Sequence, residues 1–141
     1  MITDKENTFA DRVLVAATGV VGDVVKVSHT HRNINLNLYA QVETDFDNLT
    51  SLAFTFWAGP NADGTSSRTI ASSGAIALAT LNADSGYRFT AGLGDLATTE
   101  VYVGLSATLV GTAPSVGAIT AGITEVGRSD LGARPSGFTG Y

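Results

Sequence analysis

The sequence predicts an all-β protein, an antiparallel β-sandwich, and within that class an eight-stranded jelly roll. Three observations support this fold class. Apolar and polar residues alternate with period two in almost every segment, and no segment shows a convincing amphipathic helix. The strand-like segments are short and are bounded by Gly, Asn, Asp or Pro. The chain of 141 residues also contains sixteen glycines, which supply turns between strands.

The N-terminal third of the chain predicts three strands. Val13–Ala17 and Val20–Val27 are the first two, and the second is expected to contain a bulge at Gly22–Asp23. Ile34–Val42 has the clearest pattern, because its odd and even positions separate into an aliphatic face and a polar face. We expect this third strand to have one buried face and one face toward solvent.

The middle of the chain predicts two more strands. In Leu52–Ala58 large apolar residues alternate with Ala53, Thr55 and Trp57, and the turn residues Gly59–Gly64 follow directly. Ala75–Leu81 is also apolar and is interpreted as a strand.

Three further segments complete the prediction, namely Tyr87–Ala91, Val101–Leu109 and Ala118–Val126. The total is about eight strands, although a barrel or an immunoglobulin-like sandwich would produce the same periodicity. No linker divides the pattern, so we expect one sandwich domain over residues 13–126, an N-terminal arm over residues 1–12 and a C-terminal arm over residues 127–141.

Composition excludes several classes of protein. The chain has no cysteine, so it cannot form disulfides or thiolate metal sites. Its net charge is −5 with only eight Lys and Arg residues, which argues against a nucleic-acid partner. No apolar run approaches the ~20 residues of a membrane helix. Residues 1–7 lack the basic region of a signal peptide, so we expect a soluble protein made in a cytoplasm.

No motif supports catalysis or a cofactor. His29 and His31 could supply two metal ligands from one strand face, but the chain contains no third histidine. Gly92–Ala97 matches a dinucleotide fingerprint, but a strand-like segment follows where that motif needs a helix. Asp45 and Asp47 flank a turn without the aromatic residues of a glycosidase cleft. We therefore expect a protein that is not an enzyme and that has no catalytic, cofactor or metal site.

Four aromatic side chains carry an alternative interpretation, a carbohydrate-binding sandwich module on a virion or cell surface. Tyr39 and Trp57 each lie opposite the aliphatic face of their strand, and Tyr87 and Tyr102 lie in other strands. Together they would form a stacking platform for sugar if they shared one exposed face. Packing at a sheet rim or subunit contact is the other interpretation of these residues.

The C-terminal segment, residues 127–141, has no usable periodicity. Such an end is typical of fraying, but this segment also contains side chains that gain free energy by docking on a partner. We interpret it as a partner-binding arm that uses Arg128, Leu131, Arg134, Phe138 and Tyr141.

Five segments, in order over residues 9–126, share a pattern with one known family: Phe9–Val25, Ile34–Phe46, Leu81–Phe89 with its Gly-Tyr-Arg-Phe motif, Val101–Leu105 and Gly117–Thr124. In these segments the sequence resembles the small capsid cement, or decoration, proteins of tailed bacteriophages. The chain departs from the family pattern at Lys26–His29, where an acid followed by Leu-Gly is expected, and residues 127–141 match nothing in it.

The resemblance implies a homotrimer on the outside of the phage head, the virion exterior. There it would bridge neighbouring subunits of the major capsid protein and stabilise the shell. Phe9 and Arg12, which lie in the first matched segment, would then be partner-binding residues together with those of the C-terminal arm.

Overall fold

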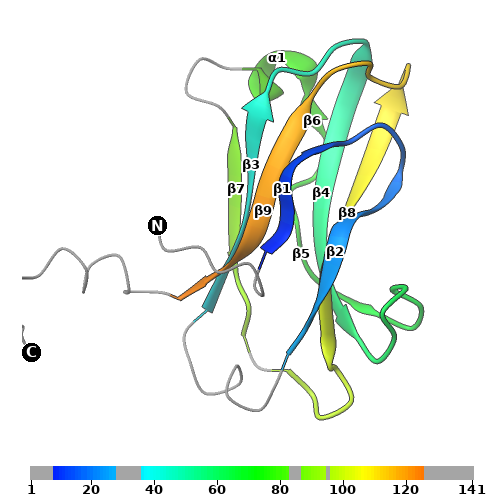
Figure 1. Ribbon diagram of the computed structural model, residues 1–141. Helices are drawn as coiled ribbons and strands as arrows, with labels where there is room; N and C mark the ends of the chain where they lie inside the picture. The colour runs from blue at the N-terminus through cyan, green and yellow to red at the C-terminus, as the bar shows by residue number, and fades with distance from the viewer. Residues whose placement is uncertain (1–7, 28–35, 83–86, 95, 126–141) are drawn as a thin grey trace, which may run out of the picture.

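The computed structural model describes residues 8–27, 36–82, 87–94 and 96–125 (Figure 1). In this part of the chain there are nine strands and one helical turn. Their bounds are β1 Thr8–Leu14, β2 Gly19–Lys26, β3 Leu36–Thr44, β4 Leu49–Gly59, β5 Arg68–Ser72, β6 Ile76–Ala77, α1 Leu78–Leu81, β7 Arg88–Gly92, β8 Tyr102–Gly111 and β9 Ala118–Glu125.

The strands form two antiparallel sheets packed face to face, which confirms the predicted sandwich (Figure 1). One sheet has the order β1-β9-β3-β7 and the other β2-β8-β4-β5, with β6 also on β4. The antiparallel pairs are therefore nested along the chain, β1 with β9, β2 with β8, β3 with β7 and β4 with β5, which is the arrangement of a jelly roll. Because β5 and β6 pair with successive parts of the same edge of β4, they take the place of one strand.

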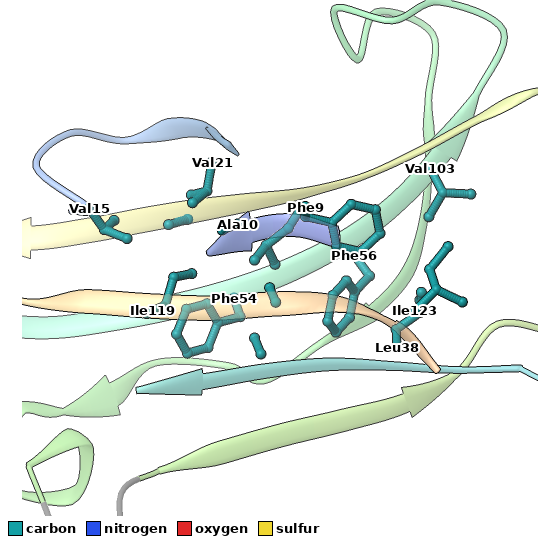
Figure 2. Packing of buried hydrophobic residues seen from close by; sticks show 14 of the residues in the cluster. Phe9, Ala10, Val15, Val21, Leu38, Phe54, Phe56, Val103, Ile119 and Ile123 are labelled. Carbon is teal, nitrogen blue, oxygen red and sulfur yellow. The ribbon is translucent and has the colours of Figure 1, made fainter. Parts of the chain in front are cut away.

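The core lies between the sheets and follows the predicted alternation. In β4 the inward positions Leu52, Phe54 and Phe56 are fully buried, and Leu38 of β3 and Ile119 of β9 face them from the other sheet (Figure 2). Burial of side chains of this size stabilises the fold by about 1.5–3 kcal/mol each. This shared apolar layer holds the two sheets together.

An aromatic row crosses the core. The ring of Phe56 lies 6.2 Å from that of Phe9 and 5.6 Å from that of Phe89, measured between centroids (Figure 2 shows Phe9 and Phe56). Phe9 belongs to β1 and Phe89 to β7, the two edge strands of one sheet, whereas Phe56 comes from the opposite sheet. Phe56 therefore joins both edges of one sheet to the centre of the other.

The predicted N-terminal arm is corrected at residues 8–12, because β1 begins at Thr8 and not at Val13. Phe9 is only 1% exposed, so it is a core residue and not a partner-binding one. The strand pattern was obscured because the register with β9 shifts twice between Thr8 and Val13, and Arg12 has a φ of 54°. Arg12 is exposed, and its backbone N–H donates to Thr120 Oγ1 at 3.3 Å.

Two other segments differ from the prediction. Ala75–Leu81 contains only the short strand β6, and the chain then turns through α1, which places Leu78 and the buried Leu81 three residues apart on one face. The strand β5 was not predicted, because Arg68–Ser72 lies at a sheet edge and is half-exposed, without a clear apolar face.

The predicted bulge in β2 is confirmed, since the register with β8 shifts between Val21 and Val25. Gly22 has a φ of +65°, and a Cβ atom there would lie 2.0 Å from the carbonyl oxygen of Phe9. This position thus requires glycine both for its conformation and for the close approach of β2 to β1.

Trp57 packs on the outer face of its sheet against glycine. Its strand partner is Gly104 on β8, where an added Cβ would lie 2.4 Å from the indole Cζ2 atom. Gly64, in the turn after β4, approaches the same ring. That turn is closed by Asp63, whose carboxylate accepts hydrogen bonds from the N–H and Oγ1 of Thr65 at 2.9 and 2.7 Å. The indole is thereby 4% exposed.

This packing predicts that Gly104→Ala lowers the free energy of unfolding by about 1–3 kcal/mol, the usual cost of forcing extra atoms into a filled site. The matched control is Gly92→Ala on β7, where an added Cβ meets nothing within 4 Å. Urea denaturation of both variants measures the difference. Equal free energies of unfolding would contradict the close contact between Trp57 and Gly104.

Candidate contact surface

Four large apolar side chains remain exposed at one end of the sandwich. Leu14, Val20, Val110 and Val116 are 50%, 44%, 51% and 51% exposed, and they are the exposed large hydrophobic residues of the part of the chain that the structure describes. They come from the β1–β2 and β8–β9 connections and the strand ends beside them (Figure 1). The strand registers place Leu14 on the outer face of one sheet, and Val20 and Val110 on the outer face of the other. We call this end of the sandwich, with its four exposed side chains, the apolar end.

Strand pairing and hydrogen bonds bring the two connections together. Leu14 pairs with Ala118, and the N–H of Val15 donates to the carbonyl of Gly117 at 3.4 Å. On the other sheet, the N–H of Leu109 donates to Thr18 Oγ1 at 3.0 Å. The β1–β2 connection is therefore attached to strands of both sheets, and this attachment gives the apolar end a defined shape.

Asp47 braces the β8–β9 connection from the turn between β3 and β4. Its carboxylate accepts hydrogen bonds from the N–H of Ser115 at 2.6 Å and of Val116 at 3.2 Å, and from the Ser115 hydroxyl. The hydrogen bond from the Ser115 side chain is the main reason why the pKa of Asp47 lies below its usual value of 3.8. Next to it, Gly117 packs on the ring of Phe46, where an added Cβ would lie 2.4 Å from Cδ2.

The two chain segments that supply these side chains contain no charged residue, although Asp47 and the exposed Asp45 lie in the turn between β3 and β4 at the same end. Neither the segment from residue 101 to residue 124 nor the segment from residue 13 to residue 22 contains a charged residue. The β1–β2 connection also forms a hollow of about 340 Å³, lined by Val13–Ala17 and Val20–Gly22. Burying the four aliphatic side chains against a partner would remove apolar area from water, and a partner that leaves Asp45 and Asp47 hydrated would avoid the cost of burying a charge.

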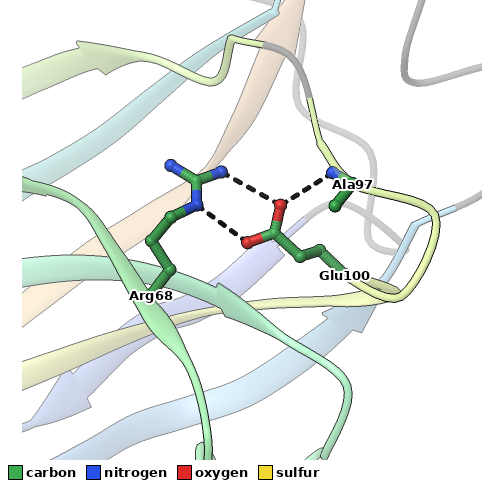
Figure 3. Close-up of polar contacts among 3 residues, drawn as sticks. All are labelled: Arg68, Ala97 and Glu100. Carbon is green, nitrogen blue, oxygen red and sulfur yellow. Dashed lines mark hydrogen bonds and ion pairs between the residues drawn. The ribbon is translucent and has the colours of Figure 1, made fainter.

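The opposite end contains the strongest ion pair of the described residues. Arg68 at the start of β5 donates from Nε and Nη2 to the two carboxylate oxygens of Glu100, at 2.8 and 3.1 Å (Figure 3). Glu100 is buried, and it also accepts the N–H of Ala97 at 2.7 Å. The hydrogen bonds that Arg68 donates to the Glu100 carboxylate raise the pKa of Arg68. The pair holds the loop before β8 against β5 through two hydrogen bonds, so its role is structural.

The aromatic residues of the carbohydrate-binding alternative do not share one exposed face, which a stacking platform would need. Tyr39 lies in the sheet of β3 and Trp57 in the other sheet, so the aromatic rings do not share a face. Tyr39 is 1% exposed, with the guanidinium of Arg88 5.0 Å from its ring centroid, and Trp57 is covered by Gly104 and Gly64. The alternation had placed both rings outward, but it does not report what covers an outward ring.

The other candidate residues have mixed outcomes. In Gly92–Ala97, β7 ends at Gly92 and the other described residues are in neither strand nor helix, and the nearby turn lies at Thr98–Thr99 with no helix in residues 96–100. Asp47 is a loop brace, whereas Asp45 is exposed. His29 and His31 lie outside the described residues. So do the predicted partner-binding residues Arg128, Leu131, Arg134, Phe138 and Tyr141.

The described residues contain no group of three or more His, Asp or Glu side chains placed to hold a metal ion. They also contain no helix of the length and hydrophobicity needed to cross a membrane. No family profile matches the chain, and no curated protein matches it significantly.

The Asp47 brace predicts a specific dependence of stability on pH. The pKa of Asp47 is lower in the folded than in the unfolded chain, so its contribution is present above about pH 3.8 and is lost as the pH falls below it. Asp47→Asn should therefore melt below the wild type at neutral pH, and the gap in Tm should close in acid. Asp45→Asn, an exposed neighbour, is the control. A gap that stays constant with pH would contradict the brace.

Proposed function

We propose that this protein is a capsid cement protein of a tailed bacteriophage. In this proposal it binds the outside of the head as a trimer and stabilises contacts between subunits of the major capsid protein. The observation that carries the proposal is the apolar end, where four exposed aliphatic side chains come from segments 13–22 and 101–124, which contain no charged residue. The jelly-roll topology and the similarity of residues 9–126 to the cement family also support it.

The energetics of the apolar end favour a multivalent contact. Each of its side chains is about half exposed, so burial against a partner would contribute about half of the ~1.5–3 kcal/mol for a complete side chain. Four such contacts supply about 3–6 kcal/mol, whereas association costs about 4–15 kcal/mol. One copy would therefore bind weakly through this surface. Three linked copies, as in the trimer that the resemblance implies, would gain affinity through effective concentration.

The proposed role requires contact and no chemistry. A protein that binds only the assembled shell stabilises that shell by mass action, and this opposes the outward pressure of packaged DNA. A rigid sandwich with exposed aliphatic side chains at one end is suited to that role, because little side-chain entropy is lost on binding. The net charge of −5 is consistent with a position on the exterior, away from the genome, after synthesis in the host cytoplasm.

The proposal predicts that the purified protein binds undecorated heads of its phage and raises their resistance to heat. Sedimentation of heads with bound protein measures the first effect, and release of DNA on heating measures the second. Heads that neither carry the protein down nor survive to a higher temperature would contradict the proposed function.

The apolar end itself is tested by placing a charge in it. Leu14→Asp and Val116→Asp should each weaken head binding by about tenfold or more, because the new carboxylate must lose its water in the contact. The matched control is Ala62→Asp, which adds the same charge to an exposed turn at the far end of β4. Equal loss of binding in all three variants, or in none, would show that another surface makes the contact.

A further inference from the structure

A groove of about 800 Å³ runs along the edge of the sandwich between β1 and β2. It is lined by Thr8, Phe9, Ala10, Asp11 and Val13 of β1, Gly22 and Asp23 of β2, and Thr120 of β9. Most of this lining is apolar or small. The carboxylates of Asp11 and Asp23 are its charged groups, and both residues are exposed.

Irregularities in the two strands create this groove. The register between β1 and β9 shifts twice, and Arg12 adopts a positive φ, so β1 bends at the groove. In β2 the bulge after Val21 carries Asp23, and Gly22 touches the backbone of Phe9. Bulges are a common way to interrupt pairing at a sheet edge, and here they leave a concave edge with two acids.

The position and charge of the C-terminal segment fit this groove. β9 pairs with β1 at Gly122 and Thr8, so Glu125, where β9 ends, is only three residues beyond the start of the groove. The next sixteen residues of the chain are long enough to run back along β1, since an extended chain spans about 3.3 Å per residue. They contain Arg128 and Arg134, two of the eight cations of the chain, and only one acid.

We propose that the C-terminal segment, residues 127–141, docks in the β1–β2 groove of its own chain, with Arg128 and Arg134 against Asp11 and Asp23. The short connection from β9 makes the effective concentration of the segment at the groove high, so modest contacts suffice. Two exposed ion pairs would strengthen docking by roughly two- to thirtyfold. This inference concerns the isolated protein and does not depend on the capsid.

The test uses the full chain, which contains no cysteine and so accepts a single label. A nitroxide on Ala133→Cys should broaden the backbone amide signals of residues 9–13, Gly22 and Asp23. It should not broaden those of β5, at the far edge of the other sheet. High salt should reduce the effect, because it screens exposed charges. Absence of broadening at Gly22 and Asp23 would overturn the proposal.

Charge variants separate docking from mere tethering near Thr8. Arg128→Gln with Arg134→Gln, and independently Asp11→Asn with Asp23→Asn, should weaken docking by roughly two- to thirtyfold. The matched control, Glu43→Gln with Asp45→Asn, removes two exposed acids outside the groove and should leave the broadening unchanged. Equal effects of all three pairs would overturn the ion-pair assignment.

Spin-labelled chains without ¹⁵N are mixed with ¹⁵N chains that carry no spin label, to show whether the segment docks on its own chain or on another copy. Broadening in ¹⁵N chains that carry the spin label themselves, and none in the mixed sample, supports docking within one chain. Broadening of the ¹⁵N chains of the mixed sample at Gly22 and Asp23 would overturn that assignment in favour of exchange between copies.

Discussion

The packing of Phe56 between Phe9 and Phe89 is the contact on which the rest of the structure depends. These rings bind the two edge strands of one sheet to the central strand of the other, and the two sheets have no backbone pairing with each other in the described residues. The contact also explains the position of Gly22, since β2 must pass the backbone of Phe9 at a distance that excludes any side chain. Loss of these ring contacts would release the edge strands β1 and β7 before the central strands, because an edge strand has a hydrogen-bonded partner on only one side.

Because the strands supply the core, the connections between the strands are available for function. At one end the Arg68–Glu100 pair fastens the loop before β8, and at the other end Asp47 fastens the loop after it. The first end has a partly buried ion pair, whereas the β8–β9 connection held by Asp47 contains no charged residue and exposes Val116. The two ends of one sandwich thus differ in chemistry, and only the apolar end has the composition of a protein contact.

The alternation of apolar and polar residues predicted the strands whose burial follows a regular pattern along one segment. The alternation in Ile34–Val42 and Leu52–Ala58 identified central strands, because such strands bury one face along their whole length. It failed at β5, whose half-exposed edge position leaves no pattern, and at Phe9, where two register shifts hide the strand. It failed as well for Trp57, because the glycine that covers the ring lies on another strand.

The candidate surface could not be found from sequence for a similar reason. Leu14, Val20 and Val110 resemble ordinary core residues of strands, and only the pairing of β1 with β9 and β2 with β8 brings them to one end. Arg68 and Glu100 are 32 residues apart without any motif. The sequence contained one signal, the absence of charged residues from residue 101 to residue 124. This signal does not show where the segment lies in the fold.

The most direct test of the central claim is a cryo-microscopy reconstruction of heads incubated with the protein. The proposed function predicts threefold density on the outer surface of the shell, into which three sandwiches fit with Leu14 and Val116 facing a capsid or neighbouring subunit. Heads without added symmetric density, or density with the apolar end facing solvent, would contradict the account.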